Sequence, residues 1–186
     1  MEEEKVLALR AYYFVPYNIS QMQMGIQAGH SGWRYARKFF ETNPETWEFV
    51  DNHETTIILD GGTTNSRRDL EGIALGTLNQ IGDALAENDI PFSFFEEPDL
   101  NDALTALCFI ADERVFDKEK YPDFADYLIE YYRAGAGISA QEIITIKMTP
   151  FETLKENVNY KKWVRLVGGI KNVFLRDLLK DKKLAR

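Results

Sequence analysis

The sequence of 186 residues has little of what metal and disulfide chemistry needs, with one cysteine and two histidines. The single thiol, Cys108, excludes an internal disulfide and argues against a cysteine-based metal site. Its position in an apolar run predicts a buried, unreactive side chain. The two histidines lie 23 residues apart without a third ligand at a recognisable spacing, so we expect neither a metal nor another cofactor.

Long hydrophobic runs and an excess of positive charge are also missing. No run of 18 apolar residues occurs, and the chain begins Met-Glu-Glu-Glu-Lys, so we expect no membrane span and no secretory signal. A cytoplasmic protein is the expectation. The 22 Lys and Arg residues are outnumbered by 30 Asp and Glu residues, which gives a formal net charge of −8. A negative charge opposes nucleic-acid binding, because that affinity depends on neutralising phosphates.

The charge is unevenly distributed along the chain. Residues 151–186 contain ten basic and four acidic residues, so the first 150 residues carry a net charge of −14. A basic carboxyl-terminal segment on an acidic body can bind RNA, bind an acidic protein partner, or fold back onto the body. The sequence leaves these three alternatives open.

Hydrophobic patterns predict an α/β fold. Apolar segments rich in β-branched and aromatic residues are typical of strands, and they cover residues 6–15, 55–59, 92–95 and 103–111. Helices are expected over residues 19–40 and 69–88. The order β-α-β-α-β-β predicts a three-layer-like α/β sandwich with a four-stranded mixed sheet, in which helical crossovers make the first strands parallel.

The second part of the chain has a helical pattern. Residues 113–186 are expected to form a helical extension that packs on an α/β domain of residues 1–112. Its most basic part, residues 161–184, predicts one long helix that Gly168 and Gly169 can bend.

The helix expected over residues 19–40 has the most informative pattern. Ser20 and Gln23 have the capping-box spacing, in which each side chain satisfies a free N–H of the other residue. A stripe of apolar and small residues is expected to face the sheet; it consists of Met22, Ile26, Gly29, Trp33, Ala36 and Phe40. The helix also contains three glycines, each costing about 1 kcal/mol relative to alanine, which indicates that a backbone or a ligand approaches closely.

Short motifs in this order resemble the type II peptidyl-tRNA hydrolases, the archaeal and eukaryotic kind. The segment Gln27-Ala-Gly-His30 resembles the Gln-x-x-His signature on that family's first helix. Asp99 and Thr105 resemble its Asp-bearing loop and the Thr that opens the last strand. The resemblance covers about residues 6–112, and the motifs are also similar to those of bacteriophage relatives of that fold.

The resemblance implies an ester hydrolase. Asp99 would orient the attacking water, and Thr105 would supply a hydroxyl. Gln27 and His30 would fix the substrate or the adjoining loop. Three of these residues can also have a purely structural role. Asp99 lies in a turn sequence and can hydrogen-bond its own backbone. Threonine is common at the start of a strand, as at Thr105, and a histidine on a sheet-facing helix, such as His30, is typically a core residue.

Candidate ligands for a substrate phosphate follow the second strand. The backbone N–H groups of Gly61 and Gly62 and the guanidinium groups of Arg67 and Arg68 suit a phosphate. The alternative is an ordinary turn, since no Gly-Lys-Ser/Thr follows to make a Walker loop. Where the family has a catalytic or phosphate-holding lysine, four residues before the helix glutamine, this chain has Gln23.

Two functions are consistent with the sequence. The first is hydrolysis of the ester bond of peptidyl-tRNA or a related acyl adduct, with tRNA or another RNA held by the basic C-terminal helix. The second is a catalytically inactive relative that binds a protein or RNA, such as a phage accessory protein. Gln23 and the acidic body favour the second function, whereas Gln27, His30, Asp99 and Thr105 favour the first. A homodimer is compatible with either.

Overall fold

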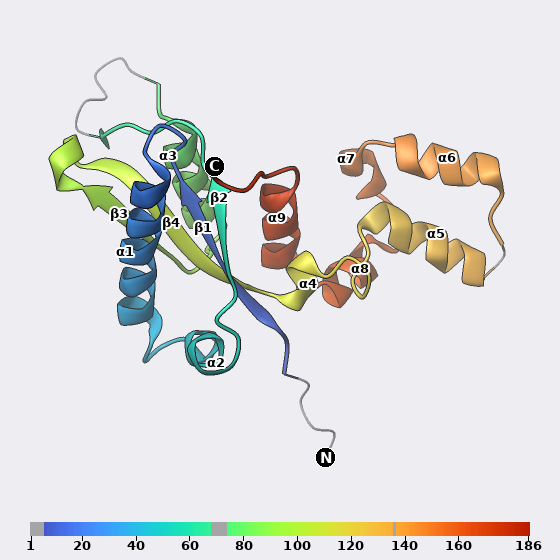
Figure 1. The fold of residues 1–186 in the computed structure, drawn as a ribbon. Helices are drawn as coiled ribbons and strands as arrows, with labels where there is room; N and C mark the ends of the chain where they lie inside the picture. Colours follow the sequence, from blue (N-terminus) through green and yellow to red (C-terminus); the bar gives the residue numbers. More distant parts are fainter. Residues whose placement is uncertain (1–5, 68–73, 136) are drawn as a thin grey trace. The chain divides into compact units, whose positions relative to one another are not determined.

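The chain forms two compact units (Figure 1). The computed structural model describes residues 6–67, 74–135 and 137–186. The first unit comprises the residues up to Glu113 together with Leu178–Arg186, and the second comprises Arg114–Asp177. The last nine residues, expected in the helical extension, therefore belong to the first unit. No helix among the described residues is long and apolar enough to cross a membrane.

The first unit is built on a four-stranded mixed sheet. Its strands are β1 (Leu9–Val15), β2 (Thr56–Asp60), β3 (Phe92–Glu97) and β4 (Ala103–Asp112). They lie in the order β2-β1-β4-β3, with β1 parallel to β2 and antiparallel to β4, and with β3 antiparallel to β4. The predicted α/β class, the four strands and the mixed sheet are confirmed.

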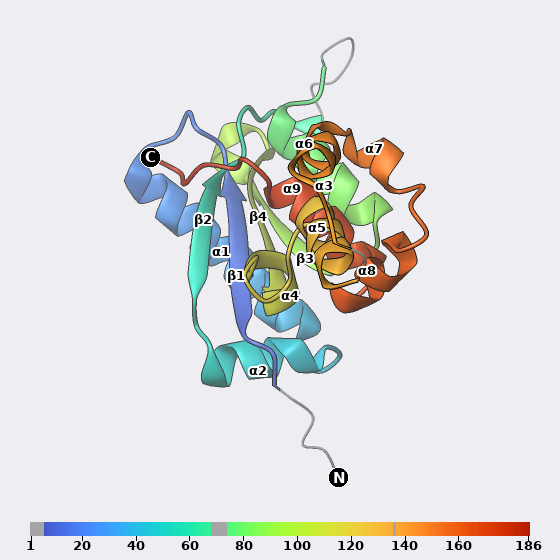
Figure 2. The ribbon, with the colours of Figure 1, turned by 90° about the vertical axis from the view of Figure 1, so that its right-hand side faces the viewer.

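Helices cover both faces of this sheet (Figure 2). The helices of the first unit are α1 (Gln21–Phe39), α2 (Pro44–Asn52) and α3 (Thr77–Glu87). Alternation along β4 separates the two cores. Cys108 and Ile110 pack with Tyr35 of α1, whereas Leu107 lies on the opposite face, beside Gly82 of α3.

The face of α1 that contacts the sheet differs from the predicted one. The buried residues are Met24, Gln27, Ala28, Ser31 and Tyr35. Met22 and Trp33, expected to be buried, are each 78% exposed. A polar residue such as Ser31 can lie in this buried stripe because it finds partners: the Ser31 hydroxyl donates to Ala28 O, and the Ser93 hydroxyl donates to Ser31 O. The predicted apolar contact face is therefore wrong.

Close packing explains one of the helix glycines within the described part of the chain. A Cβ on Gly32 would lie 2.7 Å from the hydroxyl of Tyr13. A Cβ on Gly25 or Gly29 would meet no described atom within 4 Å. The predicted close approach is confirmed at Gly32, where a side chain, and not the expected backbone or ligand, makes it. Gly25 and Gly29 lie on the outward face of α1, where no described residue packs against them.

The second unit is helical and has an aromatic core. Its helices are α5 (Phe124–Ala134), α6 (Ala140–Met148), α7 (Phe151–Leu154), α8 (Tyr160–Leu166) and most of α9 (Ile170–Leu179), and α4 (Glu113–Phe116) begins at its boundary. The buried core consists of Phe124, Leu128, Trp163, Val167 and Val173.

A buried arginine connects segments of this second unit that lie far apart in the sequence. The side chain of Arg176 is only 3% exposed. It donates to the carbonyl oxygens of Arg114 and Tyr121 over 2.5 and 2.8 Å, and to the carboxylate of Asp123 over 2.6 Å. Because a guanidinium group has five donors in a fixed plane, one side chain can satisfy all three acceptors.

The long helix expected over residues 161–184 is wrong in two respects. It is two helices, α8 and α9, because Gly168 and Gly169 take positive φ angles of 86° and 105° between them. Helix α9 ends at Leu179, and the residues after it return to the sheet of the first unit.

The last residues extend the sheet of the first unit along β2. Asp60 N donates to Lys183 O over 2.9 Å, and Ala185 N donates to Ile58 O over 3.0 Å. Leu184 thus forms an antiparallel bridge with β2. Lysine and leucine favour helices by local propensity, but pairing with a distant strand determines the conformation here.

Candidate functional site

A buried amide joins α1 to the ends of β3 and β4. Gln27 is 6% exposed on the sheet-facing side of α1. Its Nε2 donates to Glu97 Oε2 over 2.6 Å, and its Oε1 accepts from the Thr105 hydroxyl over 2.9 Å. Glu97 is the last residue of β3, and Thr105 lies near the start of β4. We call these three residues the amide network.

The orientation of the Gln27 amide follows from its partners. An ionised carboxylate only accepts hydrogen bonds, so Glu97 requires the NH₂ group of the amide to face it. The amide oxygen then faces Thr105, whose hydroxyl must donate. The same hydroxyl lies 3.3 Å from Phe95 O, a longer contact than the one to Gln27. The direction of both hydrogen bonds is therefore determined: Thr105 donates to Gln27, and Gln27 donates to one oxygen of Glu97.

An irregularity in the sheet brings Thr105 to the α1 face. The register passes from Phe95 opposite Ala106 to Glu96 opposite Leu104, so Thr105 is an extra residue on β4. Such a bulge re-aims a side chain that regular alternation would point to the other face. Thr105 and the adjacent Ala106 consequently both lie on the side of α1.

Two predicted site residues, His30 and Asp99, are close in sequence to Gln27 and Glu97, but neither belongs to the amide network. His30 is exposed, and its ring stacks on Phe95 with the centroids 4.5 Å apart, so the core-histidine alternative is wrong. Asp99 is exposed in the short 3₁₀ helix η2 (Pro98–Leu100). The carboxylate that Gln27 contacts is Glu97, two residues earlier.

Sequence reasoning missed Glu97 because it assigned this residue to an acidic loop. The signal that could have found it is the pair Glu96-Glu97 directly after the apolar part of β3. A carboxylate at the carboxyl end of a strand lies where α/β sheets collect ligands.

Gln23, which stands where the family that the motifs resemble has a lysine, lies in the first turn of α1. Its Oε1 accepts from the backbone N–H and from the hydroxyl of Ser20, each over 3.0 Å. The Gln23 N–H in turn donates to Ser20 Oγ over 3.3 Å, so the predicted capping box is confirmed. This side chain stabilises the first turn of α1 and brings no charge to the site.

Internal hydrogen bonds hold the loop after β2. Gly61 N donates to Val15 O and Gly62 N donates to the Asp60 carboxylate, each over 2.7 Å. The guanidinium group of Arg67 pairs with Asp83 of α3. A phosphate at the two glycines would have to displace their hydrogen bonds, which favours the ordinary-turn alternative.

Described residues of this loop also contact the start of β4 and the start of α3. Ser66 forms an antiparallel bridge with Ala103. Thr77, the first residue of α3, donates its N–H to the hydroxyl of Thr63 over 3.1 Å. Helix α3 begins at Thr77, and residues 69–73, where the helix was expected to start, lie outside the described residues. The remaining candidate phosphate ligand, Arg68, lies outside the described residues.

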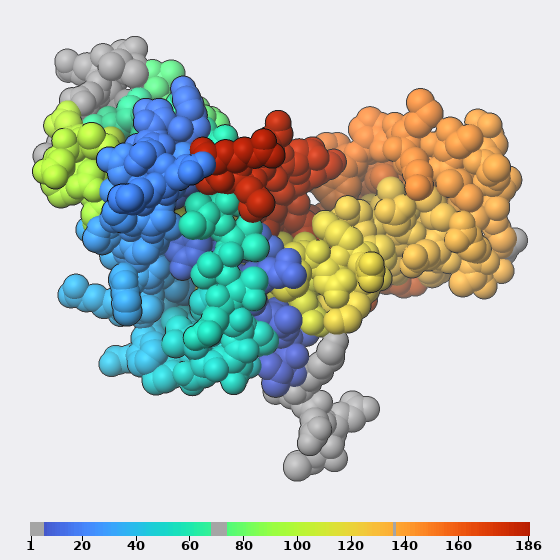
Figure 3. Space-filling model, in the orientation of Figure 1, coloured from blue at the N-terminus to red at the C-terminus, as the bar shows by residue number. Residues whose placement is uncertain are grey.

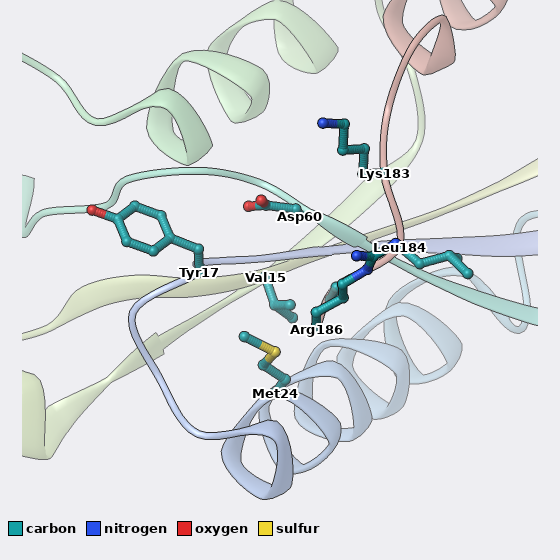
Figure 4. Close-up of a pocket in the computed structure, with 8 residues that line it drawn as sticks. Val15, Tyr17, Met24, Asp60, Lys183, Leu184 and Arg186 are labelled. Carbon is teal, nitrogen blue, oxygen red and sulfur yellow. The ribbon is translucent and has the colours of Figure 1, made fainter.

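A cavity of about 120 Å³ opens at the same end of the sheet (Figure 4). It is lined by Val15, Tyr17, Met24, Asp60 and residues 183–186. Val15 and Asp60 end the two parallel strands. The cavity and the amide network thus both lie where the carboxyl ends of β1, β2 and β3 meet the start of β4.

Within residues 6–67, 74–135 and 137–186, no three His, Cys, Asp or Glu side chains come together as a metal site would require. Comparison of the chain with models of known protein families and with curated proteins gave no match. The geometry at the end of the sheet, together with the resemblance of the motifs, is therefore the basis for a functional proposal.

Proposed function

We propose that this protein is a peptidyl-tRNA hydrolase-like ester hydrolase in which the Glu97 carboxylate activates the attacking water. The observation that carries the proposal is the contact between Gln27 and Glu97. Gln27 and Thr105 are buried, whereas Glu97 is partly exposed, so Glu97 is the member of the network that a substrate can reach. Two of the three residues also match the family's motifs.

The proposed reaction adds water to the ester carbonyl carbon. Glu97 accepts a proton from the water as its oxygen attacks, and the tetrahedral intermediate then collapses. The ester bond breaks, and the proton passes from Glu97 to the leaving ribose oxygen, which becomes a hydroxyl. The peptide leaves as a carboxylic acid and loses its remaining proton to solvent water. Gln27 is a positioning residue, because it holds one oxygen of Glu97, and Thr105 acts through Gln27 by fixing the amide orientation.

Single-turnover release of the peptide from an N-acetylated aminoacyl-tRNA tests this proposal. We expect the wild type to cleave the ester and Glu97→Gln to be slower by about 10²–10⁴-fold, the usual contribution of a general base. Glu96→Gln is the matched control, because it removes the neighbouring carboxylate of the same strand. A folded wild type that leaves the ester intact, or equal rates for the two variants, overturns the proposal.

A second candidate is a catalytically inactive relative that binds a protein. The observation that favours it is the outward face of α1, where Met22, Ile26 and Trp33 are exposed beside the open space at Gly25 and Gly29. The variant Gln23→Lys distinguishes the candidates. Hydrolysis that appears only in this variant would identify a hydrolase scaffold that lacks one charge, and would favour the binding function for the natural chain.

A further inference from the structure

The carboxyl-terminal segment, defined as residues 180–186, is attached to the first unit mainly by its backbone. Two main-chain hydrogen bonds join it to β2, and Ala185 packs against the cluster of Val15, Met24 and Ala28. Figure 3 shows the end of the chain, in red, on the surface between the start of α1 and β2. The long side chains of the segment are therefore left for other contacts.

These side chains are basic and exposed. Lys180, Lys182, Lys183 and Arg186 accompany a single acidic residue, Asp181. Lys182 lies 5.8 Å from the ring centroid of Phe14. Among the described residues, none of the four cations forms an ion pair with a carboxylate. Four exposed cations without an ion-pair partner among the described residues, on one short segment, are a suitable surface for a polyanion.

Most of the first unit has the opposite, negative charge. Outside α1, residues 1–113 contain 20 acidic and 4 basic residues. Helix α1, which contacts the segment through Met24 and Ala28, contains three basic residues and no acidic residue. An anion that approaches along the segment and α1 therefore meets the basic part of the unit first, with Asp60 as the acidic residue among those that line the cavity there.

We propose that the carboxyl-terminal segment is an RNA-binding edge that takes phosphate groups of the substrate. This proposal rests on the proposed function, in which the substrate is an RNA ester. Lys183 and Arg186 line the cavity beside Asp60 (Figure 4), at the end of the sheet where Glu97 lies. Phosphates bound there hold the RNA at the edge of the site. The sequence predicted RNA binding by one basic helix over residues 161–184, which includes three of these four cations but not Arg186.

The salt dependence of binding to deacylated tRNA tests this assignment. The test variant is Lys182→Gln, Lys183→Gln, Arg186→Gln, and the matched control is Lys161→Gln, Lys162→Gln, Arg165→Gln in α8. Both remove two lysines and one arginine. Each lost phosphate contact lowers the slope of log affinity against log salt concentration by about 0.7–0.9.

We expect the segment variant to lower that slope by about 2–3 and the α8 control to keep it. A variant with Lys182→Arg, Lys183→Arg and Arg186→Lys should retain the wild-type slope, since it preserves the charge. An unchanged slope in the segment variant, or an equal fall in both glutamine variants, overturns the proposal. Tighter binding to an acidic polypeptide than to tRNA also overturns it. Deacylated tRNA has no ester, so the result is independent of hydrolysis.

Discussion

Replacing Thr105 with valine isolates one hydrogen bond of the amide network. Valine keeps the shape of threonine but has no hydroxyl, so the Oε1 atom of Gln27 loses its donor. Thr105 is 0% and Gln27 is 6% exposed, so bulk water does not replace the lost group. A buried polar group without a partner costs about 1–3 kcal/mol. We expect Thr105→Val to lower the free energy of unfolding by that amount.

The variant Gln27→Leu has a smaller expected effect, because it removes the donor and the acceptor together. The Thr105 hydroxyl then donates to Phe95 O, and the partly exposed Glu97 carboxylate binds water. We expect a loss below about 1 kcal/mol, and little additional loss when Thr105→Val is introduced in this background. The double-mutant cycle should therefore show a coupling energy of about 1–2 kcal/mol.

Urea denaturation measures these free energies, and hydrogen exchange of the β4 amides reports the first unit separately. If the loss of stability in the double variant equals the sum of the two single losses within about 0.5 kcal/mol, the reasoning is refuted. A larger loss for Gln27→Leu than for Thr105→Val would refute the orientation assigned to the amide.

Other features of the chain give four further predictions. Gly25→Ala should raise the free energy of unfolding by about 1 kcal/mol, because its Cβ meets open space. Gly32→Ala should lower the free energy of unfolding, because its Cβ would lie 2.7 Å from the hydroxyl of Tyr13. Thermal denaturation measures both variants, and equal effects would contradict the packing described. Arg176→Met should destabilise the second unit by about 2–4 kcal/mol, measured by hydrogen exchange, since two carbonyl groups lose their donor. Burial acts to raise the pKa of Asp123, but hydrogen bonds from a lysine and from Arg176 outweigh it and hold the pKa below its usual range. The ionised group therefore stabilises the folded unit above the ordinary pKa of an aspartate, and this contribution is lost as the pH falls through the lower folded pKa; Asp123→Asn should make the unit less sensitive to acid. Burial raises the pKa of Cys108 to about 12, so the thiol should resist alkylation at about pH 8 until the protein is denatured, and rapid labelling of the native protein would contradict this.

The strands could be predicted because their signals are local. β4, expected over residues 103–111, is observed at Ala103–Asp112, since a long apolar run needs no distant partner to identify it as a buried strand. The contact face of α1 could not be predicted in this way. Gln27 and Ser31 resemble solvent-facing residues until their partners on β4 and β3, 78 and 62 residues away, are known.

The candidate site could be predicted only in part. The motifs indicated Gln27 and Thr105, and the structure brings them to 2.9 Å. The contact of Glu97 with the amide network depends on a bulge and on the register of β3 with β4, which no local pattern specifies. The basic charge of residues 180–186 was evident from the sequence, but their conformation was not, because it comes from pairing with β2.

The central claim is that Glu97, and not Asp99, is the carboxylate that acts on water. The most direct measurement compares Glu97→Gln with Asp99→Asn in single-turnover hydrolysis of the same N-acetylated aminoacyl-tRNA. We predict a loss of about 10²–10⁴-fold for Glu97→Gln and the wild-type rate for Asp99→Asn, because Gln27 holds Glu97 whereas Asp99 lies exposed in η2. Full activity in Glu97→Gln, with activity lost in Asp99→Asn, would contradict the account.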